Sequence, residues 1–253
     1  AWENVAQVDT GSTSHVALLL GDDGPNGMPL YLYVGQKSTD PAANFLERNG
    51  LSDGQMYVWK ANVSGVNSPA EFYTGTRGGS WVAIEVQDVS KAGTAGYDSL
   101  GYKNDSTLRT EADQLGAFSF SRPEDLSTNP KDGTQVAFAS TGASIAAANT
   151  ADGSADSTDT WGTVYTIKLD FSNLNAPQAA LTVLYNSNTD VTHALRNPDN
   201  LDWADDGFIY VNEDRSTTWA GGANTNEASV VRIDPVTGAI TRVAEMDRSA
   251  VPA

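Results

Sequence analysis

Short segments rich in β-branched and aromatic residues recur along the whole chain, and each is bounded by glycine, aspartate, asparagine or proline. The first group favours extended backbone, whereas the flanking residues favour turns. Helical periodicity is poor, and only residues 44–51 are expected to form one or two helical turns. We therefore predict an all-β protein with strands at residues 15–21, 29–35, 54–61, 80–86, 134–141, 161–171, 179–186, 208–214, 228–235 and 239–246.

A weak internal repeat indicates how these strands are arranged. The segments RPEDLSTNPKDGTQVAFAS, from Arg122, and NPDNLDWADDGFIYVNE, from Asn197, share proline, an acidic pair or acid and amide, leucine, and later Asp-Gly before an apolar strand. Their separation is close to two propeller blades of about 40 residues each. The alternative is that both segments are simply good turn sequences. We predict a β-propeller of about four to six blades, either incomplete or part of a larger one.

Two long segments lack a strand pattern, and no boundary divides the chain into separate domains. Residues 91–114 and 141–160 show no clear period and are expected to be loops, with disorder as the alternative for 150–160. We expect a single propeller-like domain over residues 1–253 that lacks an N-terminal segment.

The charge balance narrows the range of partners. Among 253 residues, Asp and Glu number 32 against 15 Lys and Arg, which gives a net charge of −17. Such a surface repels nucleic acid and anionic membranes, so we expect neither as a partner, while divalent cations are attracted. The chain contains no cysteine, which excludes disulfides and thiolate metal sites.

Acidic and amide side chains gather at the ends of predicted strands, in the pattern that calcium sites use. Ca²⁺ takes six to eight oxygen ligands, and loops converging from different strands can supply them without one continuous motif. The candidate metal ligands are Glu124, Asp125, Asp199, Asn200, Glu213 and Asp214, with a second cluster at Asp22 and Asp23. A transition-metal site is less favoured, because the only histidines are His15 and His193.

Several basic side chains lie beside these acidic segments. Arg122, Arg196, Arg215 and Lys37 would offset the charge of an anionic substrate if they shared a site with bound metal. The simpler interpretation is that each pairs with a neighbouring carboxylate at the surface, which contributes about 0–1 kcal/mol. We take Arg122, Glu124 and Arg196 as the candidate catalytic residues.

The order of these landmarks resembles the PhoX-type alkaline phosphatases. The resemblance runs from SHVALLLGDDGPNGMPLYLYVGQK through SRPEDLSTNPKDGTQVAFAST and WGTVYTIKLDF to NPDNLDWADDGFIYV. It implies a secreted or periplasmic β-propeller that hydrolyses small phosphomonoesters with Ca²⁺ and Fe³⁺ in its central channel. It also implies that Glu124 is a metal ligand, that Arg122 orients phosphate, and that Asp199 or Asn200 faces the channel.

The chain departs from that family pattern at identifiable positions. The family's iron ligand is a cysteine in an N-terminal region, and no cysteine is present here. Two explanations stay open: a separate segment or another copy of the chain completes the site, or this relative keeps the propeller and Ca²⁺ without iron-dependent chemistry. The alternatives to a phosphatase are therefore a non-catalytic Ca²⁺-binding secreted module and, since PDNLDWADDGFIYV also resembles gluconolactonase propellers, a Ca²⁺-dependent lactonase.

Overall fold

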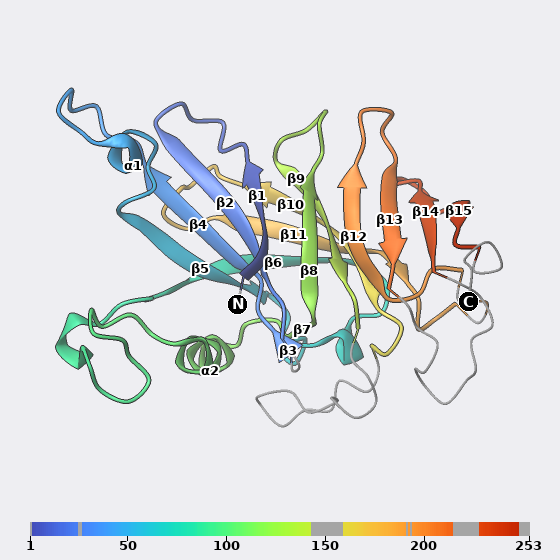
Figure 1. The fold of residues 1–253 in the computed structure, drawn as a ribbon, viewed down its shortest axis with the longest axis horizontal. Helices are drawn as coiled ribbons and strands as arrows, with labels where there is room; N and C mark the ends of the chain where they lie inside the picture. Colours follow the sequence, from blue (N-terminus) through green and yellow to red (C-terminus); the bar gives the residue numbers. More distant parts are fainter. Residues whose placement is uncertain are drawn as a thin grey trace.

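The structure is a computed structural model that describes residues 2–24, 27–142, 159–190, 192, 194–214 and 228–247. It consists mainly of β-strands, as expected (Figure 1). The strands are β1 (Trp2–Val8), β2 (His15–Asp22), β3 (Gly27–Met28), β4 (Tyr31–Gln36), β5 (Gly54–Ala61), β6 (Gly75–Ile84), β7 (Phe120–Ser121), β8 (Pro123–Thr128), β9 (Gln135–Ser140), β10 (Thr163–Asp170), β11 (Gln178–Asn186), β12 (Pro198–Trp203), β13 (Ile209–Glu213), β14 (Ser229–Ile233) and β15 (Ile240–Glu245).

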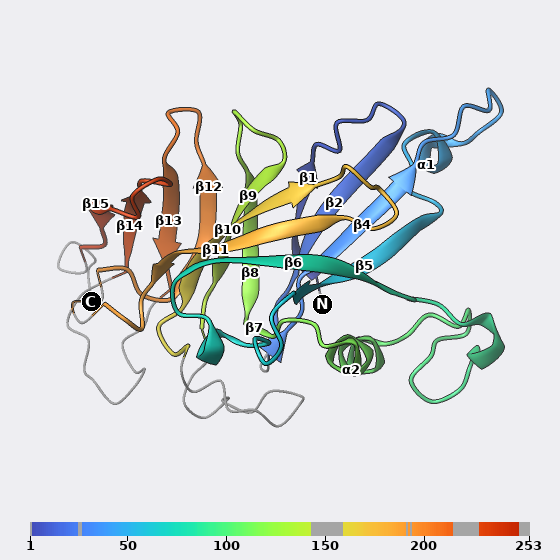
Figure 2. The ribbon, with the colours of Figure 1, turned by 180° about the vertical axis from the view of Figure 1, so that it is seen from behind.

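Nine of these strands form one antiparallel sheet that curls back on itself. Their order is β1-β2-β4-β5-β6-β11-β10-β9-β8. Figures 1 and 2 show β1 and β8 on one side of the molecule and β6, β10 and β11 on the other. The two end strands lie side by side, where the Thr128 hydroxyl donates to the Gln7 carbonyl over 2.7 Å and Asp9 N–H donates to the Gly133 carbonyl over 2.7 Å. The sheet is therefore nearly closed.

The concave side of this sheet holds an aromatic core. Phe120 contacts the rings of Phe118, Phe138 and Tyr165, with centroids 4.6, 5.2 and 5.4 Å apart, and all four residues are fully buried. Apolar side chains from every strand of the sheet complete the cluster, because alternate residues of each strand point inward. Burial of this much apolar surface is the main stabilising contribution to the fold.

The strands β12-β13-β14-β15 form a second, four-stranded antiparallel sheet. Its apolar face, which includes Trp203, Ile209 and Val231, packs on Ala139 and Val164 of the first sheet. A four-stranded meander is the unit of a propeller blade. The first nine strands, however, form one continuous sheet, so the number of blades stays a prediction.

Helices are short and lie at the edge of the sheets. The first is α1 (Phe45–Arg48), within the range expected for a helical turn, and 3₁₀ turns occur at Pro69–Glu71 and Val89–Lys91. The expectation of a loop over residues 91–114 is wrong in part, because Asp105–Leu115 forms α2. Asn104 caps its N-terminus and Gly116, with φ of 78°, ends it. Only Leu108 and Ala112 of this helix are buried, which explains why its apolar period is weak.

All ten predicted strands are present, with ends that differ by a few residues. The sequence missed β1, β3, β7, β8 and β12. In the last two, acidic side chains interrupt the apolar pattern, so the sequence predicts loops there. Most of the predicted loop 141–160 lies outside the described residues. No helix in the described part of the chain is long and apolar enough to cross a membrane.

Candidate functional site

The two repeated segments share a distinctive backbone geometry. Arg122 and Asn197 both have positive φ, 62° and 43°, and each precedes the proline that begins a strand. Both strands then carry a register shift, between Pro123 and Leu126 in β8 and between Pro198 and Leu201 in β12. Residues other than glycine rarely adopt positive φ, and such outliers are frequent at functional sites. The two segments therefore share a backbone geometry as well as a sequence pattern, and this shared geometry indicates a candidate functional site.

The bulges bring the equivalent acidic residues of the two repeats together. The carboxyl groups of Glu124 in β8 and Asp199 in β12 lie close enough to share a hydrogen bond when one of them carries a proton, although the two strands belong to different sheets. Glu124 is buried, with 4% of its surface exposed, and Asp199 is partly exposed at the rim. The Thr141 hydroxyl, just beyond the end of β9, donates to the Pro198 carbonyl over 2.7 Å and also lies close to Glu124, where it lowers the pKa of that carboxyl group. Two carboxylates and a hydroxyl from three strand ends therefore share one point.

Arg122 lies against this pair and connects it to β2. Its Nε donates to Asp23 Oδ1 over 3.0 Å, and its Nη2 contacts Glu124 Oε1. Asp23 follows β2 directly. The glycine at position 21 lets β2 come this close, because a Cβ there would lie 2.5 Å from the Pro123 carbonyl oxygen. The arginine is thereby held between two carboxylates from distant parts of the chain.

The electrostatics of the cluster favour a bound proton or a cation. Burial and the hydrogen bond with Asp199 raise the pKa of Glu124 to about 9, although Arg122 acts in the opposite direction. Burial also raises the pKa of Asp214, and Asp199 adds to this effect while Arg122 reduces it. A carboxyl group in such a place is stabilised by a positive charge that replaces its proton.

Asp125 and Asn200, the next residues in each repeat, also contact each other. The Asp125 carboxylate accepts hydrogen bonds from the backbone N–H groups of Leu126, at 3.0 Å, and Leu201, at 2.7 Å. The structure therefore places this carboxylate at the joint between the two sheets. Asn200 is exposed beside it.

Glu213 and Arg196 have a different environment from the one expected of site residues. Glu213 Oε2 lies 3.0 Å from Arg196 Nη2 and also accepts hydrogen bonds from the backbone and the hydroxyl of Ser229, at 3.0 and 2.6 Å. Glu213 Oε1 accepts the Arg196 backbone N–H at 2.8 Å. Both side chains are buried. This pair fixes the chain just before Asn197 and Asp214, whose backbones hydrogen-bond over 2.9 Å.

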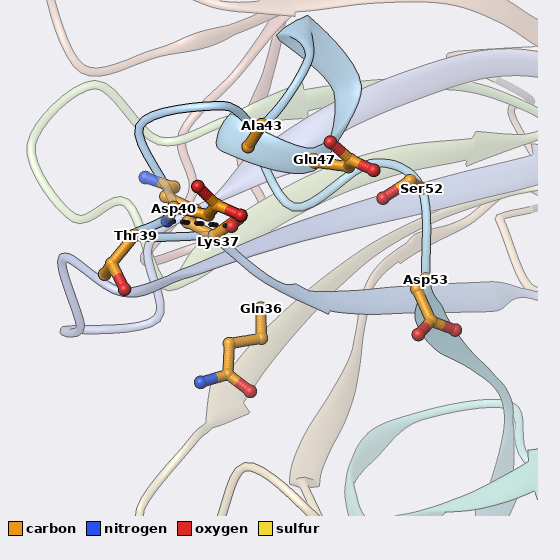
Figure 3. Close-up of a pocket in the computed structure, with 9 residues that line it drawn as sticks. Gln36, Lys37, Thr39, Asp40, Ala43, Glu47, Ser52 and Asp53 are labelled. Atoms are coloured by element: carbon orange, nitrogen blue, oxygen red, sulfur yellow. Dashed lines mark hydrogen bonds between the residues drawn. The ribbon is translucent and has the colours of Figure 1, made fainter.

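The remaining candidates do not join the cluster. Asp22 is paired through both oxygens with Arg109 of α2, at 2.9 and 2.6 Å. Lys37 instead lines a cavity of about 510 Å³ beside α1, together with Asp40, Glu47 and Asp53 (Figure 3). The His15 ring hydrogen-bonds to the Ser14 hydroxyl at the surface. His193 and Arg215 lie outside the described residues.

Sequence reasoning missed Thr141 and Arg109, whereas the family resemblance implies that the loop ending at Asp159 approaches the metal site. Thr141 and the fully buried Asp159 both follow or precede strands of the first sheet, and Asp159 accepts hydrogen bonds from Asn188 at 2.7 Å and Thr163 at 3.1 Å. A polar residue directly after the apolar run VAFAS was the available signal for Thr141. Arg109 gave no signal, because its helix was not predicted.

The cluster suits a hard cation in its chemistry. Its donors are carboxylate and hydroxyl oxygens, which Ca²⁺ prefers, and they include no sulfur. In the part of the chain that the structure describes, no three His, Asp or Glu side chains converge closely enough to hold a metal ion by themselves. Glu124 and Asp199 are thus the nucleus of a cation site rather than a complete coordination sphere.

Fold and site together define an all-β, propeller-like protein in which duplicated acidic turns meet around an arginine. The sequence model of the family described as alkaline phosphatase PhoX matches residues 1–250, so the chain belongs to the PhoX family. No curated protein matched the chain. A solved structure of Pseudomonas fluorescens PhoX in complex with vanadate, a transition state analogue, is similar with a TM-score of 0.66 and 20% identity.

That similarity covers 96% of this chain but only 44% of the Pseudomonas protein. At such low identity the comparison establishes the fold, which is β-propeller-like. The chain thus spans less than half the length of the protein that it resembles.

Proposed function

We propose that this chain contributes the metal-binding, phosphate-orienting part of a phosphomonoesterase site, with Ca²⁺ as its cation. The observation that carries this proposal is the meeting of Glu124, Asp199 and Arg122 at the joint between the two sheets. Membership of the PhoX family supports phosphate ester hydrolysis as the reaction class.

The three side chains divide the work by their chemistry. Glu124 and Asp199 would hold the cation, since both present oxygen atoms at one point. Burial also disfavours the ionised form of Glu124 unless a positive charge lies beside it. When bound, the cation would polarise a phosphoryl oxygen and offset the charge that develops there. The Arg122 guanidinium would bind further phosphate oxygens, because its planar fork of donors matches their geometry.

Asp23 would act on Arg122 rather than on the substrate. Its carboxylate accepts the hydrogen bond from Nε, and Nη2 contacts Glu124. This would fix the plane of the guanidinium so that its terminal nitrogens could also reach a phosphate group. Arg196, by contrast, is committed to Glu213 and is not part of this proposal. A small phosphorylated molecule outside the cytoplasm remains the expected substrate.

Hydrolysis of p-nitrophenyl phosphate by the purified protein tests the proposal. We expect hydrolysis that a chelator abolishes and that added Ca²⁺ restores. The variant Glu124→Gln should lose this activity, whereas Asp205→Asn, which changes an exposed carboxylate in the β12–β13 turn, should retain it.

The alternatives give different results in the same experiment. A melting temperature that rises with Ca²⁺ without any phosphate ester hydrolysis would indicate the non-catalytic binding module. Ca²⁺-dependent opening of a sugar lactone in place of phosphate ester cleavage would indicate the lactonase. Neither hydrolysis nor a Ca²⁺ response, with any metal added, would overturn the proposal.

A further inference from the structure

Three irregular strand segments meet at a single buried carboxylate, that of Asp125. The register shifts lie between Trp2 and Val5 in β1, between Pro123 and Leu126 in β8, and between Pro198 and Leu201 in β12. Asp125 lies within the second of these and contacts residues of the other two. β-Bulges are frequent next to active sites, where they change the direction of a side chain.

The contacts of Asp125 use its full capacity as an acceptor. Oδ1 receives the Leu126 N–H at 3.0 Å and the Asn4 side-chain amide, while Oδ2 receives the Leu201 N–H at 2.7 Å. The Asn200 side chain contributes a further hydrogen bond. An ionised carboxylate offers about four acceptor positions, so donors from three strands match this one group.

The location of Asp125 connects it to the site. It directly follows Glu124, and its contacts on β12 are Asn200 and Leu201, which directly follow Asp199. Within a bulge, the direction of one side chain depends on how the next residue is held. The distance between Glu124 and Asp199 therefore depends on whether Asp125 holds the two bulges together.

We propose that Asp125 is a positioning residue, which locks the bulges of β1, β8 and β12 together and so sets the spacing of Glu124 and Asp199 for a divalent cation. This inference rests on the proposed function of that pair. Asp125 does not bind the cation, because its oxygens are occupied by donors of the protein.

A second contact across the same joint provides a matched control. The Ser127 hydroxyl accepts the Trp203 N–H at 2.9 Å and lies 3.2 Å from Asp202 Oδ1. It connects β8 to β12 as Asp125 does, two residues further from Glu124. Loss of this contact should weaken the joint without changing the carboxylate pair.

The experiment compares Asp125→Asn with Ser127→Ala by calorimetric titration of the folded protein with Ca²⁺, and by hydrolysis of p-nitrophenyl phosphate over a range of Ca²⁺ concentrations. The asparagine replaces one of the two acceptor oxygens with an NH₂ group. This group is itself a donor and cannot accept the N–H groups that face it, so the bulges should separate. We expect Asp125→Asn to weaken Ca²⁺ binding about tenfold or more, as is usual for residues that orient metal ligands. Saturating Ca²⁺ should restore much of its hydrolysis. Ser127→Ala should lower the melting temperature and leave Ca²⁺ affinity unchanged.

Other outcomes separate this inference from the proposed function. Wild-type affinity in Asp125→Asn, or an equal loss in Ser127→Ala, would overturn the positioning role while leaving the cation site intact. A wild-type protein that neither binds Ca²⁺ nor hydrolyses the ester would overturn the proposed function, and the positioning role with it. If Asp125→Asn does not fold, Asn4→Ala removes one donor to the same carboxylate and should give a smaller loss of affinity; no loss would overturn the inference.

Discussion

The carboxyl groups of Glu124 in β8 and Asp199 in β12 lie within reach of each other across the boundary between two sheets, close enough to share a proton. They occupy equivalent positions in the repeated segments, each two residues after a positive-φ residue and one after a proline. Like charges this close are unfavourable unless a proton or a cation lies between them. The duplication therefore has a chemical consequence, because it creates a pair of carboxylates that neither segment could form alone.

Removing either member of this pair should impair the same function. We expect Glu124→Gln and Asp199→Asn each to reduce phosphate ester hydrolysis about a hundredfold, a magnitude typical of lost transition-state stabilisation. The double variant should be little worse than either single one, because residues that act as a unit are not additive. Initial rates at saturating Ca²⁺ measure this effect.

Replacing the arginine tests the phosphate-binding role separately. Arg122→Lys keeps the positive charge but loses the planar donors that reach both Asp23 and Glu124. We expect the efficiency kcat/KM to fall about tenfold to a hundredfold while Ca²⁺ affinity changes little. The exposed Arg48 is a suitable control, since Arg48→Lys should have no effect. A loss of Ca²⁺ affinity equal to the loss of efficiency would contradict this role.

The fold class and strand positions could be predicted because apolar runs such as VALLL and FIYV bury one face or both. Strands β8 and β12 could not, since the residues that make their bulges are the acidic ones. The sequence shows that Glu124 and Asp199 are equivalent, but it does not show that the backbone turns them toward each other. That depends on positive φ at Arg122 and Asn197, which nothing in their residue types requires.

The sequence also could not predict which basic side chain pairs with each of the acidic residues. Asp22, Glu213 and Glu124 look alike as acidic residues at strand ends. The structure pairs Asp22 with Arg109 of an unpredicted helix and surrounds Glu213 with Arg196 and Ser229. An acidic residue is available to a functional site only if no arginine pairs with it fully. The positions of the arginines depend on contacts between distant parts of the chain, which the sequence pattern does not reveal.

The buried pair of Arg196 and Glu213 should act on stability rather than on cation binding. Glu213→Gln removes the carboxylate that pairs with the buried Arg196 guanidinium, and breaking a buried ion pair typically costs about 3–5 kcal/mol. Chemical denaturation without Ca²⁺ should show a loss of this size. Glu245→Gln, which disrupts the exposed pair with Arg242, should cost about 0–1 kcal/mol. If Glu213→Gln instead kept its stability and lost its response to Ca²⁺, Glu213 would be a metal ligand, as the sequence predicted.

Asp159 should give the protein a distinct dependence of stability on pH. Burial raises its pKa from 3.8 to about 6, although the side chains of Asn188, Thr163 and Ser140 donate hydrogen bonds to it. Between these two values the folded state binds more protons than the unfolded state, so the free energy of unfolding falls as pH rises. The contribution is complete below about pH 4 and is lost by about pH 6, with a total of about 3 kcal/mol.

Urea denaturation at a series of pH values measures this effect, with Asp159→Asn as the comparison. The asparagine does not titrate, so the difference in unfolding free energy between the variant and the wild type should change in favour of the variant from pH 4 to pH 7. Other carboxyl groups titrate equally in both proteins and cancel in that difference. Parallel profiles for the two proteins would mean that Asp159 keeps its ordinary pKa when the chain folds, which its complete burial makes unfavourable.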